Sequence, residues 1–322
     1  MKLFFGVVFL LSFTAFGLAG NNSITSINYK YHNNYSAGDK VPALTDGTFI
    51  YIKPDMHSKV MDNLASMSEL EITKAVKVNV SSSAKWYKVK YRNKNNNERE
   101  GYVRNTDLPV VTAKLPGGRT DIKLLVGLSE MKTTFTNRDG DEHECKNSVS
   151  VVLGKNGKKL SGTIFGVDLD GGIEVLDKMR YGTKDYSDFL NYIETDEFEP
   201  KMSFIKMDLP CEQCECVSYT VFLPIQGDII KPAIVMTSFF VPDSLSDADY
   251  FGQSYLYIMP SDTDGMKNSI LYTMYWYTSD MKKVTIMEQA EYHYDGEKFI
   301  VNWVPKKKKF KGDYTKYLGY ED

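Results

Sequence analysis

Short segments in which apolar and polar residues alternate recur along most of this chain. In residues 86–91, WYKVKY, the apolar Val89 and Tyr91 alternate with Lys88 and Lys90. Successive side chains of a strand point to opposite faces, so this pattern places one face on a core and the other in water. Turn residues separate this segment from similar segments on both sides. The sequence therefore predicts a mainly β protein.

The first group of such segments lies between residues 42 and 109. Short strand-like segments follow one another there with turn-like breaks at close spacing, which is typical of a small barrel. The next residues, 110–121, include Pro116, Gly117 and Gly118, which do not continue a strand. They predict a linker between this barrel and the rest of the chain.

A larger β-rich domain is expected over residues 122–304. Residues 269–278, SILYTMYWYT, are apolar or aromatic on both faces, as in a central strand. One segment differs, because its apolar residues recur at helical spacing. These residues are Tyr186, Phe189, Leu190 and Ile193. We therefore expect one or two short helices among the strands of this domain.

Residues 1–19 have the features of a secretory signal peptide. Lys2 precedes an apolar run that ends in the small residues Gly17 and Ala19, at the positions that a signal peptidase reads. The alternative is an uncleaved membrane anchor, although the run is short for a span and no later segment approaches the required length. Residues 20–41 are rich in Asn, Ser and Tyr and predict a flexible leader. The sequence thus predicts an exported protein, periplasmic or extracellular, with no transmembrane segment in its mature chain.

The net charge of the chain bears on whether its partner is a nucleic acid. A net charge of -3 at pH 7 gives no indication of nucleic-acid binding. Hydrophobic residues make up 42% of the chain and charged residues 25%, as in ordinary globular proteins. The basic segment 305–322 predicts a disordered tail.

Three of the four cysteines lie close together, at Cys211, Cys214 and Cys216, and Cys145 lies far upstream. Cysteines of exported proteins tend to pair, so we expect one local disulfide within the cluster and one long disulfide from Cys145 to the remaining thiol. Two alternatives stay open. The clustered thiols with Cys145 or His143 would suit a tetrahedral zinc site, or the thiols are free or redox-active.

A set of short motifs in the first strand-rich region matches a known family. The matching segments are Ile52–Pro54, Ser58–Val60, Leu64, Trp86–Val89, Gly101–Val103 and Asp107–Leu108. Through these segments residues 48–108 resemble the bacterial Src-homology-3-type (SH3-like) domain of exported proteins. The resemblance implies a small SH3-like barrel.

The same resemblance implies contact with peptidoglycan or with a protein partner. The expected ligand-binding residues are Tyr51, Lys53, Trp86 and Tyr102. An exposed aromatic ring gives a rigid surface that suits a peptide stem or the face of a sugar. The alternative is that the three aromatic rings fill the core of a barrel too small to have one without them.

Two acidic turns stand in the second half of the chain. Their residues are Asp168, Asp170 and Gly171 in one turn and Asp262, Asp264 and Gly265 in the other. They weakly resemble the D-x-D-x-D-G loops of FG-GAP and integrin-like extracellular β repeats, which bind calcium. Asp and Gly are equally favoured in plain hairpin turns. We therefore expect no cofactor, with calcium and structural zinc as the two open alternatives.

Motifs of common enzymes are missing from the sequence. The four histidines are spread along the chain, and there is no G-x-S-x-G, H-E-x-x-H or Gly-rich phosphate-binding motif. We therefore expect no catalytic residues, and a binding protein of the cell envelope that contacts cell-wall glycan or peptide, or an envelope protein. Two alternatives stay open: a secreted hydrolase without a recognisable motif, and a disulfide-stabilised β-repeat adhesion or structural protein.

Overall fold

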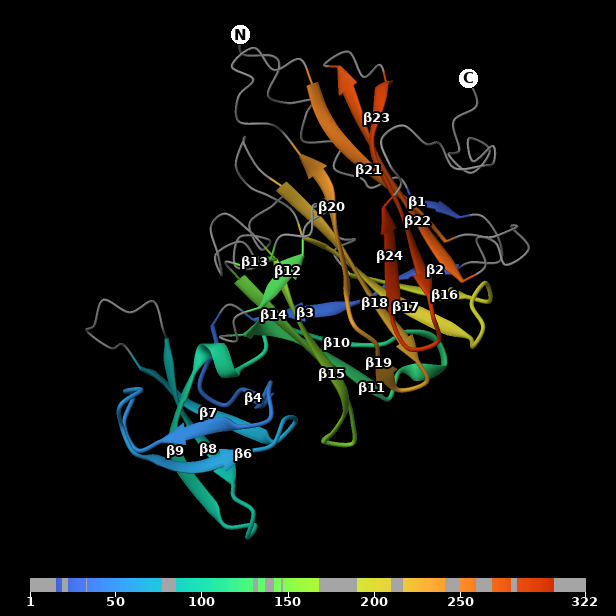
Figure 1. Ribbon diagram of the computed structural model, residues 1–322. Helices are drawn as coiled ribbons and strands as arrows, with labels where there is room; N and C mark the ends of the chain where they lie inside the picture. The colour runs from blue at the N-terminus through green and yellow to red at the C-terminus, as the bar shows by residue number, and fades with distance from the viewer. Residues whose placement is uncertain are drawn as a thin grey trace.

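The computed structural model describes most of the chain. The described residues are 16–18, 23–32, 34–76, 85–129, 133–136, 142–145, 147–167, 190–209, 217–240, 250–258, 268–278 and 283–303. These residues form β-strands and two short 3₁₀ turns, and they contain no α-helix. The prediction of a mainly β protein is confirmed. The strands make three large sheets and one two-stranded sheet, and the large sheets follow one another through the molecule as tiers (Figure 1).

The six-stranded sheet and the turn after it form the six-stranded unit, residues 40–108. Its strand order is β4-β7-β8-β9-β5-β6. On β8, Tyr87, Val89 and Tyr91 are buried in the core of this unit, and the lysines between them are half-buried. The alternation read from the sequence is therefore confirmed. The elements are β4 (Lys40–Pro42), β5 (Thr48–Tyr51), β6 (Val60–Leu64), β7 (Glu69–Val76), β8 (Trp86–Arg92), β9 (Glu98–Arg104) and the 3₁₀ turn η2 (Asn105–Asp107).

The five-stranded sheet has the order β15-β14-β11-β10-β3, with β15 at one edge. One of its faces packs on the long sheet, and the other faces the six-stranded unit. A separate pair, β12 (Thr134–Thr136) and β13 (Glu142–Glu144), lies close by in the chain. The strands of the five-stranded sheet are β3 (Tyr29–Tyr31), β10 (Val111–Lys114), β11 (Ile122–Ser129), β14 (Asn147–Lys155) and β15 (Lys158–Val167), with the turn η3 (Gly117–Arg119) between β10 and β11.

The long sheet contains eleven strands and follows the path β2-β16-β17-β18-β20-β21-β22-β23-β24. It curves back on itself, so that the ring of Phe299 in β24 lies 6.1 Å from the ring of Phe204 in β17. Its strands are β1 (Phe16–Leu18), β2 (Ser23–Ser26), β16 (Leu190–Thr195), β17 (Met202–Leu209), β18 (Val217–Gln226), β19 (Ile229–Ile230), β20 (Ile234–Phe240), β21 (Tyr250–Ile258), β22 (Ser269–Thr278), β23 (Lys283–Tyr294) and β24 (Phe299–Trp303).

The long sheet is covered by apolar side chains on both faces. Ile205 and Leu223 face the five-stranded sheet and share a core with its residues Leu124 and Val151. Phe204 and neighbouring side chains of the opposite face form a second core inside the curve of the sheet. The prediction of a central strand at residues 269–278 agrees with its place, since β22 is paired with β21 and β23.

The predicted helix around Leu190 and Ile193 is wrong at both residues, because they lie in strand β16. Tyr192 packs in the core shared with the five-stranded sheet, and Ile193 packs in the core on the other face. A strand with both faces covered has apolar residues at any spacing, including the spacing of a helix. Tyr186 and Phe189 lie outside the described residues.

The segment predicted as a flexible leader, residues 20–41, contains two paired strands. Residues 23–26 are β2, which pairs with β16 in the long sheet, and residues 29–31 are β3, which pairs with β10. Ile27 between them is 2% exposed. These pairings join residues that are far apart in the sequence, so local composition does not reveal them. β1 lies within the segment predicted as a signal peptide and pairs with β21; cleavage of that segment stays a prediction.

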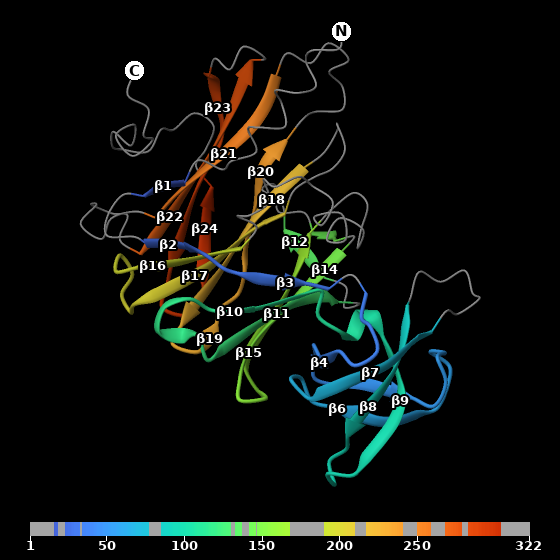
Figure 2. The same ribbon diagram turned by 180° about the vertical axis from the view of Figure 1, so that it is seen from behind.

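The predicted linker, residues 110–121, is also structured. β10 is paired on both sides, with β3 and with β11. The side chain of Arg119 in η3 donates to Asp228 at 2.8 Å, which ties this turn to the long sheet. β3 and β10 are thus neighbouring antiparallel strands through which the chain enters and leaves the six-stranded unit, as Figure 2 shows from behind.

A small apolar cluster joins the six-stranded unit to the five-stranded sheet. Leu44 and Met67 of the unit are buried against Leu125 of β11 and Val152 of β14. Glycines of the sheet leave room for them, because an added Cβ on Gly154 would come within 2.4 Å of the Met67 side chain. The six-stranded unit is therefore packed against the sheet and not only tethered to it.

Candidate binding cleft

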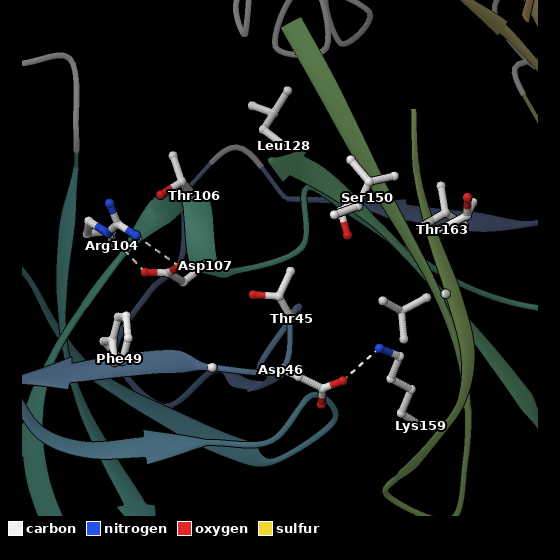
Figure 3. Close-up of a pocket in the computed structure, with 15 residues that line it drawn as sticks. Thr45, Asp46, Phe49, Arg104, Thr106, Asp107, Leu128, Ser150, Lys159 and Thr163 are labelled. Carbon is white, nitrogen blue, oxygen red and sulfur yellow. Dashed lines mark hydrogen bonds and ion pairs between the residues drawn. The ribbon is translucent and has the colours of Figure 1, made fainter. Parts of the chain in front are cut away.

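A cleft of about 590 Å³ lies between the six-stranded unit and the five-stranded sheet, beside this apolar cluster. Figure 3 shows side chains of both parts converging on it. The volume lies within the range of ordinary small-ligand sites, roughly 300–1,000 Å³. The lining residues are Thr45, Asp46, Gly47, Phe49, Arg104, Thr106, Asp107, Leu128, Ser150, Val151, Val152, Lys159, Gly162, Thr163 and Ile164.

The loop at residues 43–47 forms one wall and is held by backbone and side-chain hydrogen bonds. The amide of Leu44 donates to the carbonyl oxygen of Asp107 at 3.0 Å. The hydroxyl of Ser66 donates to the carbonyl oxygen of Leu44 at 2.8 Å, and its amide donates to Oδ1 of Asp46 at 2.9 Å. These bonds fix the position of Asp46 at the mouth of the cleft.

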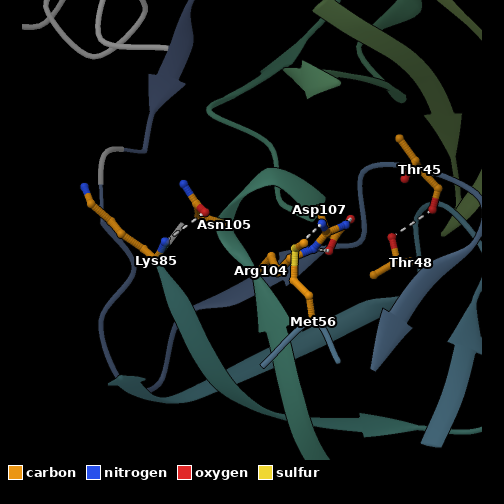
Figure 4. A network of polar contacts seen from close by, with 7 residues as sticks. All are labelled: Thr45, Thr48, Met56, Lys85, Arg104, Asn105 and Asp107. Carbon is orange, nitrogen blue, oxygen red and sulfur yellow. Dashed lines mark hydrogen bonds and ion pairs between the residues drawn. The ribbon is translucent and has the colours of Figure 1, made fainter. Parts of the chain in front are cut away.

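A buried ion pair stands on the same wall. The guanidinium of Arg104 donates from Nε to Oδ2 of Asp107 at 3.1 Å and from Nη2 to Oδ1 at 3.3 Å (Figure 4). The two side chains are 10% and 12% exposed. The η2 turn brings them together, and it is fixed by Asn105 and Lys85, each of which donates from its amide to the other residue. Removal of one partner of a buried pair leaves an uncompensated charge, so loss of either side chain should destabilise this wall.

A second ion pair crosses the cleft. Nζ of Lys159, from β15, lies 2.7 Å from Oδ2 of Asp46. The hydrogen bond from Lys159 lowers the pKa of Asp46 below its ordinary value. The pair therefore stabilises the packing of the six-stranded unit against the five-stranded sheet at neutral pH. This contribution is lost as the pH falls through the lowered pKa of Asp46. Both side chains are more than a third exposed, which limits the contribution to about 0.2–1 kcal/mol.

The other wall is the face of β14 and β15 that points toward the six-stranded unit. Ser150 of β14 pairs with Ile164 of β15, and Val152 pairs with Gly162. Ser150 is 2% exposed, and its hydroxyl points into the space toward Thr45 (Figure 3). The sheet thus supplies a mixed surface of methyl groups and hydroxyls.

Phe49 supplies an exposed aromatic ring that the sequence analysis did not select. It is 41% exposed, whereas its strand neighbours Thr48 and Ile50 are fully buried. The signal was present in the sequence, because alternation along TFIY puts Phe49 on the outer face once Ile50 is assigned to the core. The ring of Phe49 is therefore accessible from the cleft that it lines.

Two of the four residues predicted to bind a ligand have buried rings. Tyr51 is 6% exposed and Trp86 is 3% exposed, and their rings meet edge to face at 5.4 Å. Both rings are buried against each other, but neither belongs to the core cluster of the six-stranded unit, so the choice between a binding role and a core role stays open. Tyr102 is half-buried beside Tyr51 in the β5–β9 pairing, and Lys53 is exposed. Neither lines the cleft, and their role in binding stays a prediction.

The predicted disulfide and metal sites fall largely outside the described residues. Cys145 is buried, at 6% exposed. Cys211, Cys214 and Cys216 are not described, and neither are the two acidic turns at 168–171 and 262–265. Among the residues that the structure does describe, no group of three or more His, Cys, Asp or Glu side chains is placed to hold a metal ion. Disulfide pairing, zinc and calcium all stay predictions.

A Ser, a His and a Glu meet at one end of the β22–β23 pair. The hydroxyl of Ser269 donates to Oε1 of Glu291 at 2.6 Å and lies 3.2 Å from Nδ1 of His293. In a catalytic triad the imidazole stands between the hydroxyl and the carboxylate, so that it accepts the hydroxyl proton. Here the hydroxyl stands in the middle and gives its proton to the carboxylate. Ser269 is also 0% exposed, so this arrangement is not assembled for attack on a substrate.

In comparisons with known proteins, no family model, no curated protein and no solved structure matched the chain. Among the residues that the structure describes, no helix has the length and apolar character that crossing a membrane requires. The interpretation of the cleft therefore depends on its own chemistry.

Proposed function

We propose that this protein is an exported, non-catalytic binding protein of the cell envelope, and that its ligand occupies the cleft. The six-stranded unit is the region that resembles SH3-like domains of exported proteins, and the N-terminal segment has the features of a signal peptide. Both resemblances favour a ligand of the cell wall, either glycan or peptide, over an intracellular metabolite. An envelope protein is the remaining class of partner.

The observation that carries the proposal is the composition of the cleft. Phe49 offers an exposed ring for contact, and the apolar and hydroxyl groups of β14 and β15 face it across the cavity. Both carboxylates in the lining form ion pairs with basic side chains, Asp46 with Lys159 and Asp107 with Arg104. None of the lining residues is a His or a Cys. This combination favours recognition of a ligand over its chemical conversion.

Co-sedimentation with purified peptidoglycan tests the proposal. The wild-type protein is expected to sediment with the wall material at low salt, and Phe49→Ala is expected to sediment less while melting at nearly the same temperature. Ile52→Ala is the matched control, because Ile52 is 45% exposed but does not line the cleft. Failure of the wild type to sediment would exclude a wall ligand. If Phe49→Ala and Ile52→Ala reduced sedimentation equally, the cleft would be excluded as the binding site of the wall material.

A further inference from the structure

The hydroxyl of Ser150 differs from an ordinary buried polar group in its hydrogen bonding. Ser150 is 2% exposed and lines the cavity, yet no hydrogen bond of its side chain is found among the described residues. Ser148, two residues earlier on the same face of β14, is also buried, and its hydroxyl lies 2.9 Å from that of Thr133. Leaving a buried hydroxyl without a partner costs about 1–3 kcal/mol. A ligand group that pairs with Ser150 would recover this cost.

The charges of the cleft are balanced. Its four charged side chains form two pairs, Arg104 with Asp107 and Lys159 with Asp46. The lining therefore carries no net charge. An ionic ligand would meet no uncompensated charge in the lining, and displacing a partner of the buried Arg104–Asp107 pair would leave a charge uncompensated. The electrostatics of the cleft favour a neutral ligand.

Hydroxyl groups are frequent in the lining. Thr45, Thr106 and Thr163 contribute hydroxyls in addition to Ser150. A hydroxyl both donates and accepts, so it matches another hydroxyl in either direction. The exposed ring of Phe49 adds an apolar surface. A sugar ring has these properties, because it is neutral, carries many hydroxyls and has one apolar face.

We infer that the cleft binds a neutral sugar unit of a larger carbohydrate, with the Ser150 hydroxyl as a hydrogen-bond anchor and the Phe49 ring as a stacking surface. The inference rests on the proposed function, because it names the ligand class of the same cleft. It goes beyond that function by selecting the glycan over the charged peptide of the wall and over a protein partner.

Calorimetric titration of the full chain tests the inference with N,N′-diacetylchitobiose and cellobiose as neutral probes and a tripeptide with free termini as the charged one. We expect saturable binding of at least one disaccharide and none of the tripeptide. Ser150→Ala should weaken disaccharide binding about tenfold, the loss of roughly one hydrogen bond. The melting temperature of this variant should be unchanged or higher, because an unpaired buried hydroxyl has been removed.

Ser148→Ala is the matched control for that substitution. It should leave disaccharide affinity unchanged and lower the melting temperature, because Thr133 loses its partner. The inference is overturned if neither disaccharide binds, if only the tripeptide binds, or if Ser150→Ala binds disaccharide as the wild type does. Wall sedimentation that persists without disaccharide binding would overturn the inference alone. If the protein showed neither disaccharide binding nor wall sedimentation, the proposed function would be excluded as well.

Discussion

At the scale of single residues, glycine controls how closely the six-stranded unit approaches the sheet. An added Cβ on Gly127 in β11 would lie 2.3 Å from Cδ2 of Leu44 and 3.3 Å from the carbonyl oxygen of Leu108. Leu44 is fully buried, so its side chain has little room to move aside. Glycine inside a strand marks such a close approach of another segment. The cleft depends on this contact, because Leu44 belongs to the loop at residues 43–47, which forms one of its walls.

Gly127→Ala should therefore destabilise the protein. Overpacking of a filled interface costs about 1–3 kcal/mol, and chemical unfolding of the full chain measures it. Gly118→Ala is the control, because a Cβ at Gly118 meets nothing within 4 Å; its free energy of unfolding should be unchanged or slightly higher. If the two variants unfold at the same denaturant concentration, the packing of Leu44 against β11 is not as described.

The sequence predicted some residues well and others not at all. The alternation in residues 86–91 was sufficient to assign Val89 and Tyr91 to one face, because period 2 is a local property of a strand. The Ser150 hydroxyl has no partner among the described residues, and this depends on what β11, β15 and the six-stranded unit place around it. No local pattern carries that information, so the proposed anchor of the cleft was not predictable from sequence.

At the scale of elements, two isoleucines near the N-terminus distinguish between two interpretations of residues 20–41, a flexible leader and a set of paired strands. Ile27 is 2% exposed and its amide donates to the carbonyl oxygen of Leu190 at 2.9 Å. Ile24 in β2 is 40% exposed. The polar composition of this region hides the difference, because short strands at a sheet edge need few apolar residues.

Ile27→Ala should cost about 2–5 kcal/mol of unfolding free energy, as expected for a buried isoleucine. Ile24→Ala should change it by no more than about 0.5 kcal/mol. Thermal or chemical unfolding of the two variants gives the comparison, with the same residue type and the same substitution in each. Two neutral variants would restore the interpretation of residues 20–41 as a leader.

At the scale of the whole molecule, the six-stranded unit is an insertion between two neighbouring strands of the five-stranded sheet. The chain enters it after β3 and leaves it before β10, and these strands are paired through Tyr31 and Val111. This arrangement holds the unit at both ends, whereas a single linker would hold it at one. The pairing of β3 with β10 holds the two ends of the insertion together. This long-range pairing therefore positions the cleft wall that contains Arg104.

The sequence predicted the fold class and the two strand-rich regions, because alternation and turn residues are local signals. It did not predict where β2, β3 and β10 pair, since each is only three or four residues long and its partner is distant or set by the tertiary fold. The cleft between the two parts could not be predicted for the same reason. Its lining comes from the loop at residues 43–47 and from β5, β9, η2, β11, β14 and β15, which only the assembled fold brings together.

The central claim is that a ligand binds between the six-stranded unit and the five-stranded sheet. Amide hydrogen exchange of the full chain, with and without soluble peptidoglycan fragments, tests it most directly. Exchange should slow together at residues 45–49, 104–107 and 162–164, which line the cleft from both sides, and stay unchanged in the turn at residues 93–97. Slowing confined to residues 53–59 and 93–97, or no change at any of the cleft residues, would contradict the account.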